Sequence, residues 1–172
     1  MPVSWVRALQ CSPRQTSLAV TADRDLPPVL CMEGRCLTDS VVYVASVTET
    51  GTGKTETYTG LTGNRFKERY YKHCSDMRNA KDRNNTSLSA HVWSLKDQNL
   101  SYSIKWDFIE KAPTFNPVTK KCRLCLKEKY HILYNNNNNS TLNRRQEIFN
   151  TCRHRKQRLL ANFNTWGQKF SF

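Results

Sequence analysis

The sequence predicts an α+β fold in which a small antiparallel sheet of about three strands is flanked by helices. Three segments have strand character (residues 41–47, 55–61 and 100–108), and the segments between and after them carry apolar residues at helical spacing. The predicted order is β-β-α-α-β-α-α. Strands and helices do not alternate regularly in this order, as they would in a doubly wound parallel sheet, and we therefore predict the α+β class.

The first two strands are predicted to form a hairpin. Residues 41–47 are β-branched and aromatic, which is typical of a strand buried on both faces, and residues 55–61 form the second strand. The connection, Gly51-Thr-Gly-Lys-Thr55, resembles part of a phosphate-binding loop. However, Thr48 stands where that loop needs its first glycine, and a strand follows in place of a helix. We interpret the connection as a hairpin turn.

Two helices and a third strand follow. The first helix is predicted over residues 64–79, and Thr86 is the expected N-cap of the second. The stripe along the first helix consists of Phe66, Tyr70, Cys74 and Met77. Residues 100–108 alternate strictly, so that one face of a half-buried strand should carry Leu100, Tyr102, Ile104, Trp106 and Phe108.

The C-terminal part is predicted to hold two more helices, over residues 121–134 and 143–163, separated by a loop containing five consecutive asparagines at 135–139. Residues 1–30 show little periodicity and are interpreted as a loose leader. The expected division is therefore a leader at 1–30, a domain at 31–163 and a short tail at 164–172.

The charge of the chain favours a polyanionic partner. The 172 residues carry a net charge of +13. Residues 1–60 hold five basic and six acidic side chains, whereas residues 61–172 hold 22 basic and eight acidic ones. Such a one-sided excess points to nucleic acid. We expect no membrane span and no secretory signal, and hence an intracellular, nuclear protein.

A set of polar residues suggests phosphodiester chemistry. Pairing of the first two strands could bring the phenols of Tyr43 and Tyr58 together, and Arg69 and His73 share one face of the following helix. Glu128 is an isolated carboxylate in a basic region, which suits Mg²⁺. Phosphodiester cleavage needs a metal or base for the water and a cation for the phosphate. The alternative is structural, with both tyrosines in the core and Arg69 paired with Glu128.

The arrangement of these residues resembles the GIY-YIG nuclease domain. The likeness rests on Val41-Val-Tyr43, Tyr58-Thr-Gly-Leu-Thr62, Phe66-Lys-Glu-Arg69 and His73. Further blocks at 88–97, 121–129, 142–147 and 152–154 are similar to the version found at the C-terminus of Penelope-like retroelements. The likeness covers residues 31–163. The first block lacks the usual glycine and isoleucine, and Thr59 replaces isoleucine in the second, where its buried hydroxyl would need a partner.

The resemblance implies a divalent-metal-dependent endonuclease that nicks DNA, using Mg²⁺ or Mn²⁺. Tyr43 would act as the general base or orient the water, although a phenol with its ordinary pKa of about 10 is a poor base. Tyr58 would position the nucleophile and Arg69 would hold the phosphate. Glu128 would bind the metal, and Asn143 would be an auxiliary polar residue. The domain would belong to a larger element that includes a reverse transcriptase.

Seven cysteines leave two zinc sites open, because a disulfide framework is not expected without a secretory signal. The resemblance implies two cysteines just before the first tyrosine block, which are Cys31 and Cys36, with His73 and His154 as partners. His73 could serve the active site instead. Spacing alone also allows Cys122, Cys125, Cys152 and His154. A third alternative is that the cysteines of the second set are buried thiols without zinc.

The basic segment after residue 143 is the expected grip on DNA phosphates, and its candidate contacts are Arg144, Arg145, Arg153, Arg155, Lys156 and Arg158. The competing function is a catalytically decayed, non-enzymatic module that binds nucleic acid or zinc.

Overall fold

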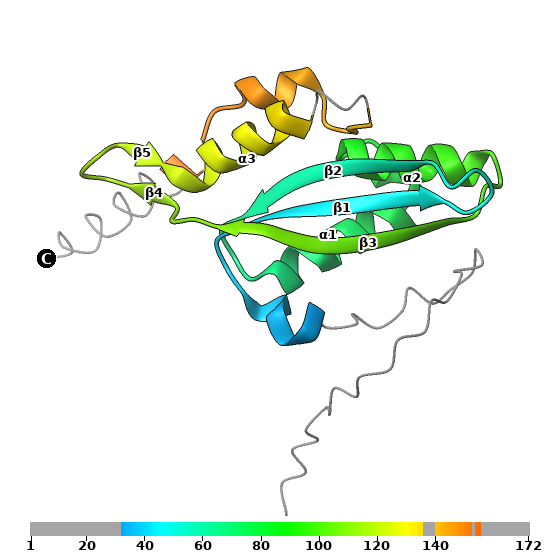
Figure 1. The fold of residues 1–172 in the computed structure, drawn as a ribbon, viewed down its shortest axis with the longest axis horizontal. Coiled ribbons are helices and arrows are strands. Elements are labelled where there is room, and N and C mark those ends of the chain that lie inside the picture. Colours follow the sequence, from blue (N-terminus) through cyan, green and yellow to red (C-terminus); the bar gives the residue numbers. More distant parts are fainter. Residues whose placement is uncertain (1–31, 136–139, 153, 156–172) are drawn as a thin grey trace, which may run out of the picture.

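The computed structural model describes residues 32–135, 140–152, 154 and 155. The predicted leader and tail, as well as Cys31, lie outside these residues. The described part has the predicted α+β fold, with a three-stranded antiparallel sheet and three α-helices (Figure 1). The strands are β1 (Val41–Glu49), β2 (Thr55–Thr62) and β3 (Tyr102–Lys111), and their order in the sheet is β2-β1-β3. A short 3₁₀ helix, Met32–Leu37, precedes the sheet.

The first two strands form the predicted hairpin. Thr48 pairs with Thr55 next to the turn, and Val41 pairs with Thr62 at the other end. Gly53 in the turn has a φ of +69°, a backbone conformation that glycine adopts without strain. The Gly51–Thr55 segment is therefore a hairpin turn.

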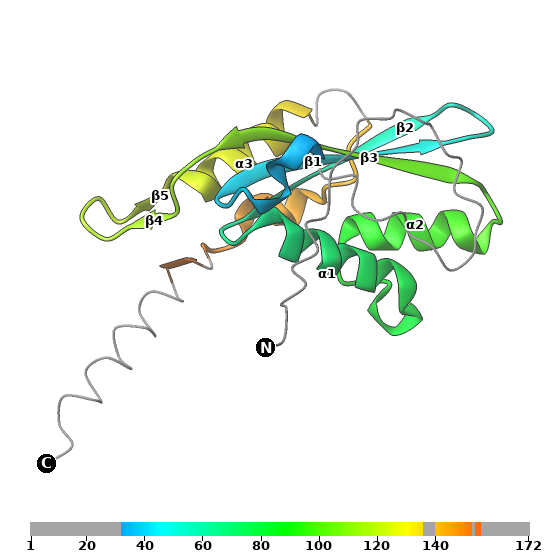
Figure 2. The ribbon, with the colours of Figure 1, turned by 90° about the horizontal axis from the view of Figure 1, so that it is seen from below.

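One face of the sheet packs against α1 (Phe66–Arg78) and α2 (Ser87–Asp97), which lie on the same side in Figure 2. Thr86 is the N-cap of α2, as predicted, and forms a capping box with Ser89. A 3₁₀ turn, Ala80–Asp82, lies between the two helices. The alternation predicted for the third strand is confirmed. All five predicted side chains pack against this core, namely Leu100, Tyr102, Ile104, Trp106 and Phe108.

The opposite face is partly covered by α3 (Arg123–Asn135), so the sheet lies between α3 and the α1–α2 pair (Figure 2). Val42, Ala112 and Leu124 form a second apolar cluster there. The predicted burial of β1 on both faces holds only near its start, where Val42 is buried on this side, whereas Val44 and Ser46 are half-buried. A small hairpin of β4 (Phe115–Asn116) and β5 (Lys121–Cys122) leads into α3. Among the described residues, no helix is both long and apolar enough to cross a membrane.

The continuous helix predicted over residues 143–163 is wrong in its first part. Residues 145–149 form one 3₁₀ helix, Arg145–Phe149, and residues 150–152 are not helical. Asn143 is not helical, and its side chain pairs with the edge strand β2. Its amide oxygen accepts from the N–H of Thr59 at 2.7 Å, and its amide nitrogen donates to the Thr59 carbonyl at 2.8 Å. The part of the prediction after residue 155 lies outside the described residues.

Candidate active-site cleft

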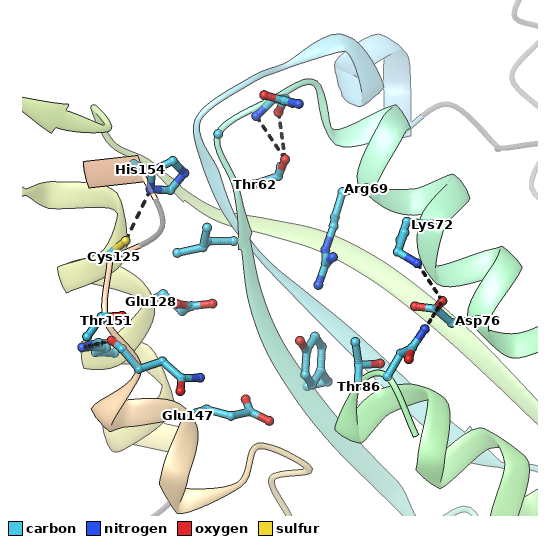
Figure 3. Close-up of a pocket in the computed structure, with 17 residues that line it drawn as sticks. Thr62, Arg69, Lys72, Asp76, Thr86, Cys125, Glu128, Glu147, Thr151 and His154 are labelled. Carbon is cyan, nitrogen blue, oxygen red and sulfur yellow. Dashed lines mark hydrogen bonds and ion pairs between the residues drawn. The ribbon is translucent and has the colours of Figure 1, made fainter. Parts of the chain in front are cut away.

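A cleft of about 520 Å³ opens along the edge of β2, with α1 on one side and α3 on the other (Figure 3). The residues after 140 complete the α3 side. Polar and charged side chains from five separate stretches of the sequence face this cleft, including Tyr58, Arg69, Lys72, Glu128, Glu147 and His154. Three residues that the resemblance assigns to one reaction (Tyr58, Arg69 and Glu128) therefore line the same cleft.

Tyr43 lies beneath the cleft and organises two other predicted site residues. Its side chain is fully buried, and it does not line the cleft. Nε of Arg69 donates to the phenol oxygen at 3.0 Å, and Nε2 of His73 lies 2.7 Å from the same oxygen. Because Arg69 donates to the oxygen, the phenol proton remains available for His73. Tyr43 thus holds the guanidinium of Arg69 through its Nε, and Arg69 lines the cleft.

Tyr58 is the phenol that reaches the cleft, although its side chain is only 6% exposed. It lies on the same face of the sheet as Tyr43, as pairing of the strands predicted, and both rings make edge contacts with His73. Gly60 lies between the two phenols. A Cβ atom there would stand 2.5 Å from Oη of Tyr43 and 3.0 Å from Cε1 of Tyr58. The glycine of the Tyr58-Thr-Gly block is therefore a steric requirement.

Burial keeps both phenols protonated. It raises the pKa of Tyr43 to about 12, and the positive charge of Arg69 offsets only part of this rise. Burial also raises the pKa of Tyr58, with Tyr43 adding to the effect. A general base would need a pKa that is lowered toward neutral pH. The role of Tyr43 as a base stays a prediction, and burial shifts its pKa in the direction opposite to the one that role requires.

The two basic residues that contact Tyr43, His73 and Arg69, differ in charge. Burial, together with smaller effects of the positive charges of Arg69 and Lys72, lowers the pKa of His73 to about 3, so that the imidazole is neutral. Burial alone would lower the pKa of Arg69, but the phenols of Tyr43 and Tyr58 outweigh it and raise the pKa. Arg69 is therefore a permanent positive charge in the cleft, and His73 is a neutral support behind it.

Glu128 reaches the cleft from α3, one helical turn beyond Cys125 (Figure 3). Its carboxylate is close enough to both site tyrosines to act on their pKa values. The predicted metal-binding carboxylate and the predicted phosphate-binding cation thus face each other across one cleft. Oxygen from a carboxylate is the donor type that Mg²⁺ and Mn²⁺ prefer.

Glu147 is a cleft residue that the sequence analysis missed. Its Oε1 accepts from Oγ of Ser87 at 2.6 Å, and its Oε2 accepts from the side-chain amide of Asn143 at 2.7 Å. It also acts on the pKa values of Tyr43 and Tyr58. A signal for it existed, because Glu128 and Glu147 are the two acidic side chains after residue 120. Asn143, predicted as an auxiliary polar residue, orients this second carboxylate.

Thr59, which departs from the family pattern, has the hydroxyl partner that it requires. The side-chain amide of Asn135 donates to Oγ1 of Thr59 at 3.3 Å. The threonine is therefore accommodated in a buried position of β2 without an unpaired hydroxyl.

One of the two sets of zinc ligands is brought together. The ligand atoms of Cys122, Cys125, Cys152 and His154 all lie within 4.8 Å of one another. Nδ1 of His154 is 3.6 Å from Sγ of Cys122 and 3.4 Å from Sγ of Cys125, and Sγ of Cys125 is 3.5 Å from Sγ of Cys152. Tetrahedral zinc, with bonds of about 2.3 Å to sulfur and about 2.0 Å to nitrogen, requires S···S and S···N separations of about 3.5–3.8 Å. The cluster fits zinc.

The thiols of this cluster differ in acidity. Burial raises the pKa values of Cys122 and Cys125. At Cys152 burial acts in the same direction, but hydrogen bonds from the backbone of Arg155 and from the neighbouring thiols outweigh it and lower the pKa. Cys152 is therefore the thiol that loses its proton first.

The first predicted zinc set is not assembled in the described residues. Cys31 lies outside them. Cys36 is buried, and Nε2 of His73 is used by the phenol of Tyr43. His154 lies with the cysteines of the other set.

The predicted DNA contacts are described only in part. Arg144, Arg145 and Arg155 are exposed. Arg153, Lys156 and Arg158 lie outside the described residues.

Comparison of the chain with models of protein families, with curated proteins and with solved structures finds no match.

Proposed function

We propose that this chain is a divalent-metal-dependent DNA endonuclease of the GIY-YIG type, which hydrolyses a phosphodiester bond and nicks DNA. The observation that carries the proposal is the common cleft of Tyr58, Arg69 and Glu128. These residues come from β2, α1 and α3, and the resemblance to retroelement nucleases assigns all three to one reaction. If the two tyrosines were only core residues, there would be no reason for the carboxylate of Glu128 and the positive charge of Arg69 to lie on opposite walls of the same cleft.

The chemistry of the site follows from the charge of each group. Arg69 would bind a non-bridging oxygen of the scissile phosphate and stabilise the charge that develops there. Tyr43 and His73 would hold Arg69 in position from below, through the hydrogen bonds to the Tyr43 phenol. Tyr58 would orient the attacking water as a neutral phenol, because its pKa is raised by burial.

Glu128 would hold the divalent cation, with Glu147 as a second oxygen donor on the same side of the cleft. When bound, Mg²⁺ or Mn²⁺ lowers the pKa of water and neutralises charge on the phosphate. Lys72 and Lys129 also line the cleft and would attract the DNA backbone. The exposed Arg144, Arg145 and Arg155 would extend this contact. The resemblance to retroelement nucleases implies a nuclear location and a role beside a reverse transcriptase.

Nicking of supercoiled plasmid in Mg²⁺ or Mn²⁺ tests the proposal. Glu128→Gln and Arg69→Lys should each lower the nicking rate by about 100-fold or more, since each removes a group that acts on the transition state. Binding of the plasmid, measured by gel shift at fixed salt, should change far less. Glu68→Gln and Arg78→Lys are the matched controls, because they make the same two chemical changes at exposed residues of α1. They should leave the nicking rate unaffected.

The proposal fails if the unmodified protein and the Glu128→Gln variant bind plasmid and leave it equally intact. The second candidate, a non-enzymatic zinc-binding module, is favoured by the cluster of three cysteines and His154. It predicts stoichiometric zinc in the purified protein together with the absence of nicking.

A further inference from the structure

Residues 140–152 together with 154 and 155, which we name the strap, form part of one wall of the cleft. Glu147, Asn150, Thr151 and His154 of the strap face the cleft. In Figure 3 the strap passes beside α3, opposite the wall made by α1. Anything that releases the strap therefore opens the cleft on that side.

The first end of the strap is attached to the edge of the sheet. The N–H of Thr57 donates to the carbonyl of Ser140 at 2.8 Å, and the N–H of Leu142 donates to the carbonyl of Thr57 at 2.7 Å. The side chain of Asn143 continues this ladder by pairing with the backbone of Thr59. This end is held by the backbone and needs no metal.

The middle of the strap is held by polar contacts rather than by apolar packing. Glu147 accepts from Ser87 at the start of α2, and Nζ of Lys129 donates to the carbonyl of Asn150 at 2.9 Å. No residue of the 3₁₀ helix Arg145–Phe149 is buried, and Phe149 is 78% exposed. The hydrophobic effect therefore contributes little to holding this segment.

The second end of the strap meets α3 at the cysteine cluster. Cys152 and His154 belong to the strap, whereas Cys122 is the last residue of β5 and Cys125 lies in the first turn of α3. In the structure, sulfur contacts of 3.4–3.6 Å link these groups across the two segments. With zinc, the same four groups become one covalently coordinated unit that joins the two segments.

His154 links this unit to the cleft itself. Its Nδ1 faces the cysteines, while its Nε2 lies against the turn between β2 and α1, where a Cβ atom on Gly63 would approach it to 2.8 Å. Cys125 is one turn from Glu128 on α3. A zinc ion would therefore fix the strap, the β2–α1 turn and the helix that carries Glu128 relative to one another.

We propose that zinc bound by Cys122, Cys125, Cys152 and His154 is a tether that holds the strap against α3, so that zinc occupancy controls whether the cleft is closed on this side. The sheet and the helices α1 and α2 fold without it. Tyr43, Phe66, Leu88 and Val92 of their common core lie in segments that contribute no ligand. The tether does not depend on cleavage, so an inactive protein would have it too.

Hydrogen–deuterium exchange of the reduced full-length protein, before and after treatment with a zinc-selective chelator, tests the tether. Elemental analysis should give one zinc ion per chain before chelation. Removal of zinc should accelerate exchange at least tenfold in residues 145–152 and less than twofold in β1 and α2. Addition of Zn²⁺ should restore the slow exchange.

The variant His154→Gln should bind zinc more weakly and show fast exchange in residues 145–152 before any chelator is added. His91→Gln is the matched control, because His91 lies on α2 and pairs with Glu56. It should behave like the unmodified protein.

Three results would overturn the tether. The first is the absence of bound zinc, including the case in which mass spectrometry finds a Cys125–Cys152 disulfide. The second is unchanged exchange in residues 145–152 after zinc removal. The third is an acceleration of exchange in β1 and α2 equal to that in residues 145–152. Loss of nicking alone bears on the nuclease proposal and not on this one, because exchange is measured without DNA.

Discussion

Gly60 in β2 lies so close to Tyr43 in β1 that a Cβ atom at residue 60 would stand 2.5 Å from the phenol oxygen. Real Cβ atoms do not approach an oxygen so closely, and Tyr43 has no room to move because it is fully buried. The phenol also anchors Arg69 and His73. A side chain at residue 60 would therefore disturb the support of the cleft as well as the core.

Gly60→Ala should lower the free energy of unfolding by about 1–3 kcal/mol, the usual cost of adding a methyl group to a packed core. Urea unfolding followed by circular dichroism measures this change. Gly51→Ala is the matched control, because its nearest neighbour would be the side chain of Glu49 at 3.9 Å. It should change the free energy of unfolding by less than about 0.5 kcal/mol. Equal effects of the two substitutions would contradict the steric argument.

Tyr58→Phe should slow nicking more than Tyr43→Phe, because Tyr58 lines the cleft and Tyr43 lies beneath it. We expect a loss of about 100-fold for the group that orients water, and about tenfold for the one that only positions Arg69. Single-turnover nicking with excess enzyme separates both from effects on DNA binding. If Tyr43→Phe is the more damaging, Tyr43 acts directly on the reaction and our assignment of a positioning role is wrong.

The stability of the protein should fall with acid because of His73. Its pKa in the folded state, about 3, is below the ordinary value of 6.5. The unfolded chain therefore binds a proton that the folded one excludes. The stabilisation is fully present above pH 6.5 and is lost as the pH falls from 6.5 toward 3.

The expected slope from His73 is about 1 kcal/mol per pH unit near pH 5.5. His73→Gln removes this dependence on pH. The free energy of unfolding of the unmodified protein minus that of the variant should therefore decrease by about 1 kcal/mol from pH 6 to pH 5. His91, whose pKa is also lowered by burial, contributes to both proteins and cancels. A difference that stays constant with pH would mean that His73 is protonated as easily in the folded state as in the unfolded one.

Local sequence patterns correctly predicted the elements that are defined by the spacing of apolar residues or by a capping residue within one segment. The strict alternation from Leu100 to Phe108 fixed the buried face of β3, and the capping signal at Thr86 fixed the start of α2. These features depend on neighbours within one segment. The turn at Gly53 was predictable for the same reason, because the residues that demand it are adjacent.

Other features depend on tertiary partners that no local pattern reveals, and these were not predicted. A helix was predicted from residue 143, but the amide of Asn143 pairs with the open edge of β2. Likewise, spacing could not decide between two sets of zinc ligands. The choice of His154 for Cys122, Cys125 and Cys152 follows from the position of α3 on the sheet, which no local pattern encodes.

Asn143→Ala should both destabilise the protein and loosen the strap. The substitution leaves the N–H and the carbonyl of Thr59 without partners in a buried position of β2, and it removes the donor that orients Glu147. The loss of two buried hydrogen bonds should cost about 2–4 kcal/mol in the free energy of unfolding. Exchange should accelerate in residues 140–147 even when zinc is bound, because zinc holds only the far end of the strap. Asn84→Ala, at an exposed position before α2, is the matched control and should change neither quantity. A normal stability of Asn143→Ala would mean that water replaces the amide at the edge of β2, and the sheet edge would then not be what holds this end of the strap.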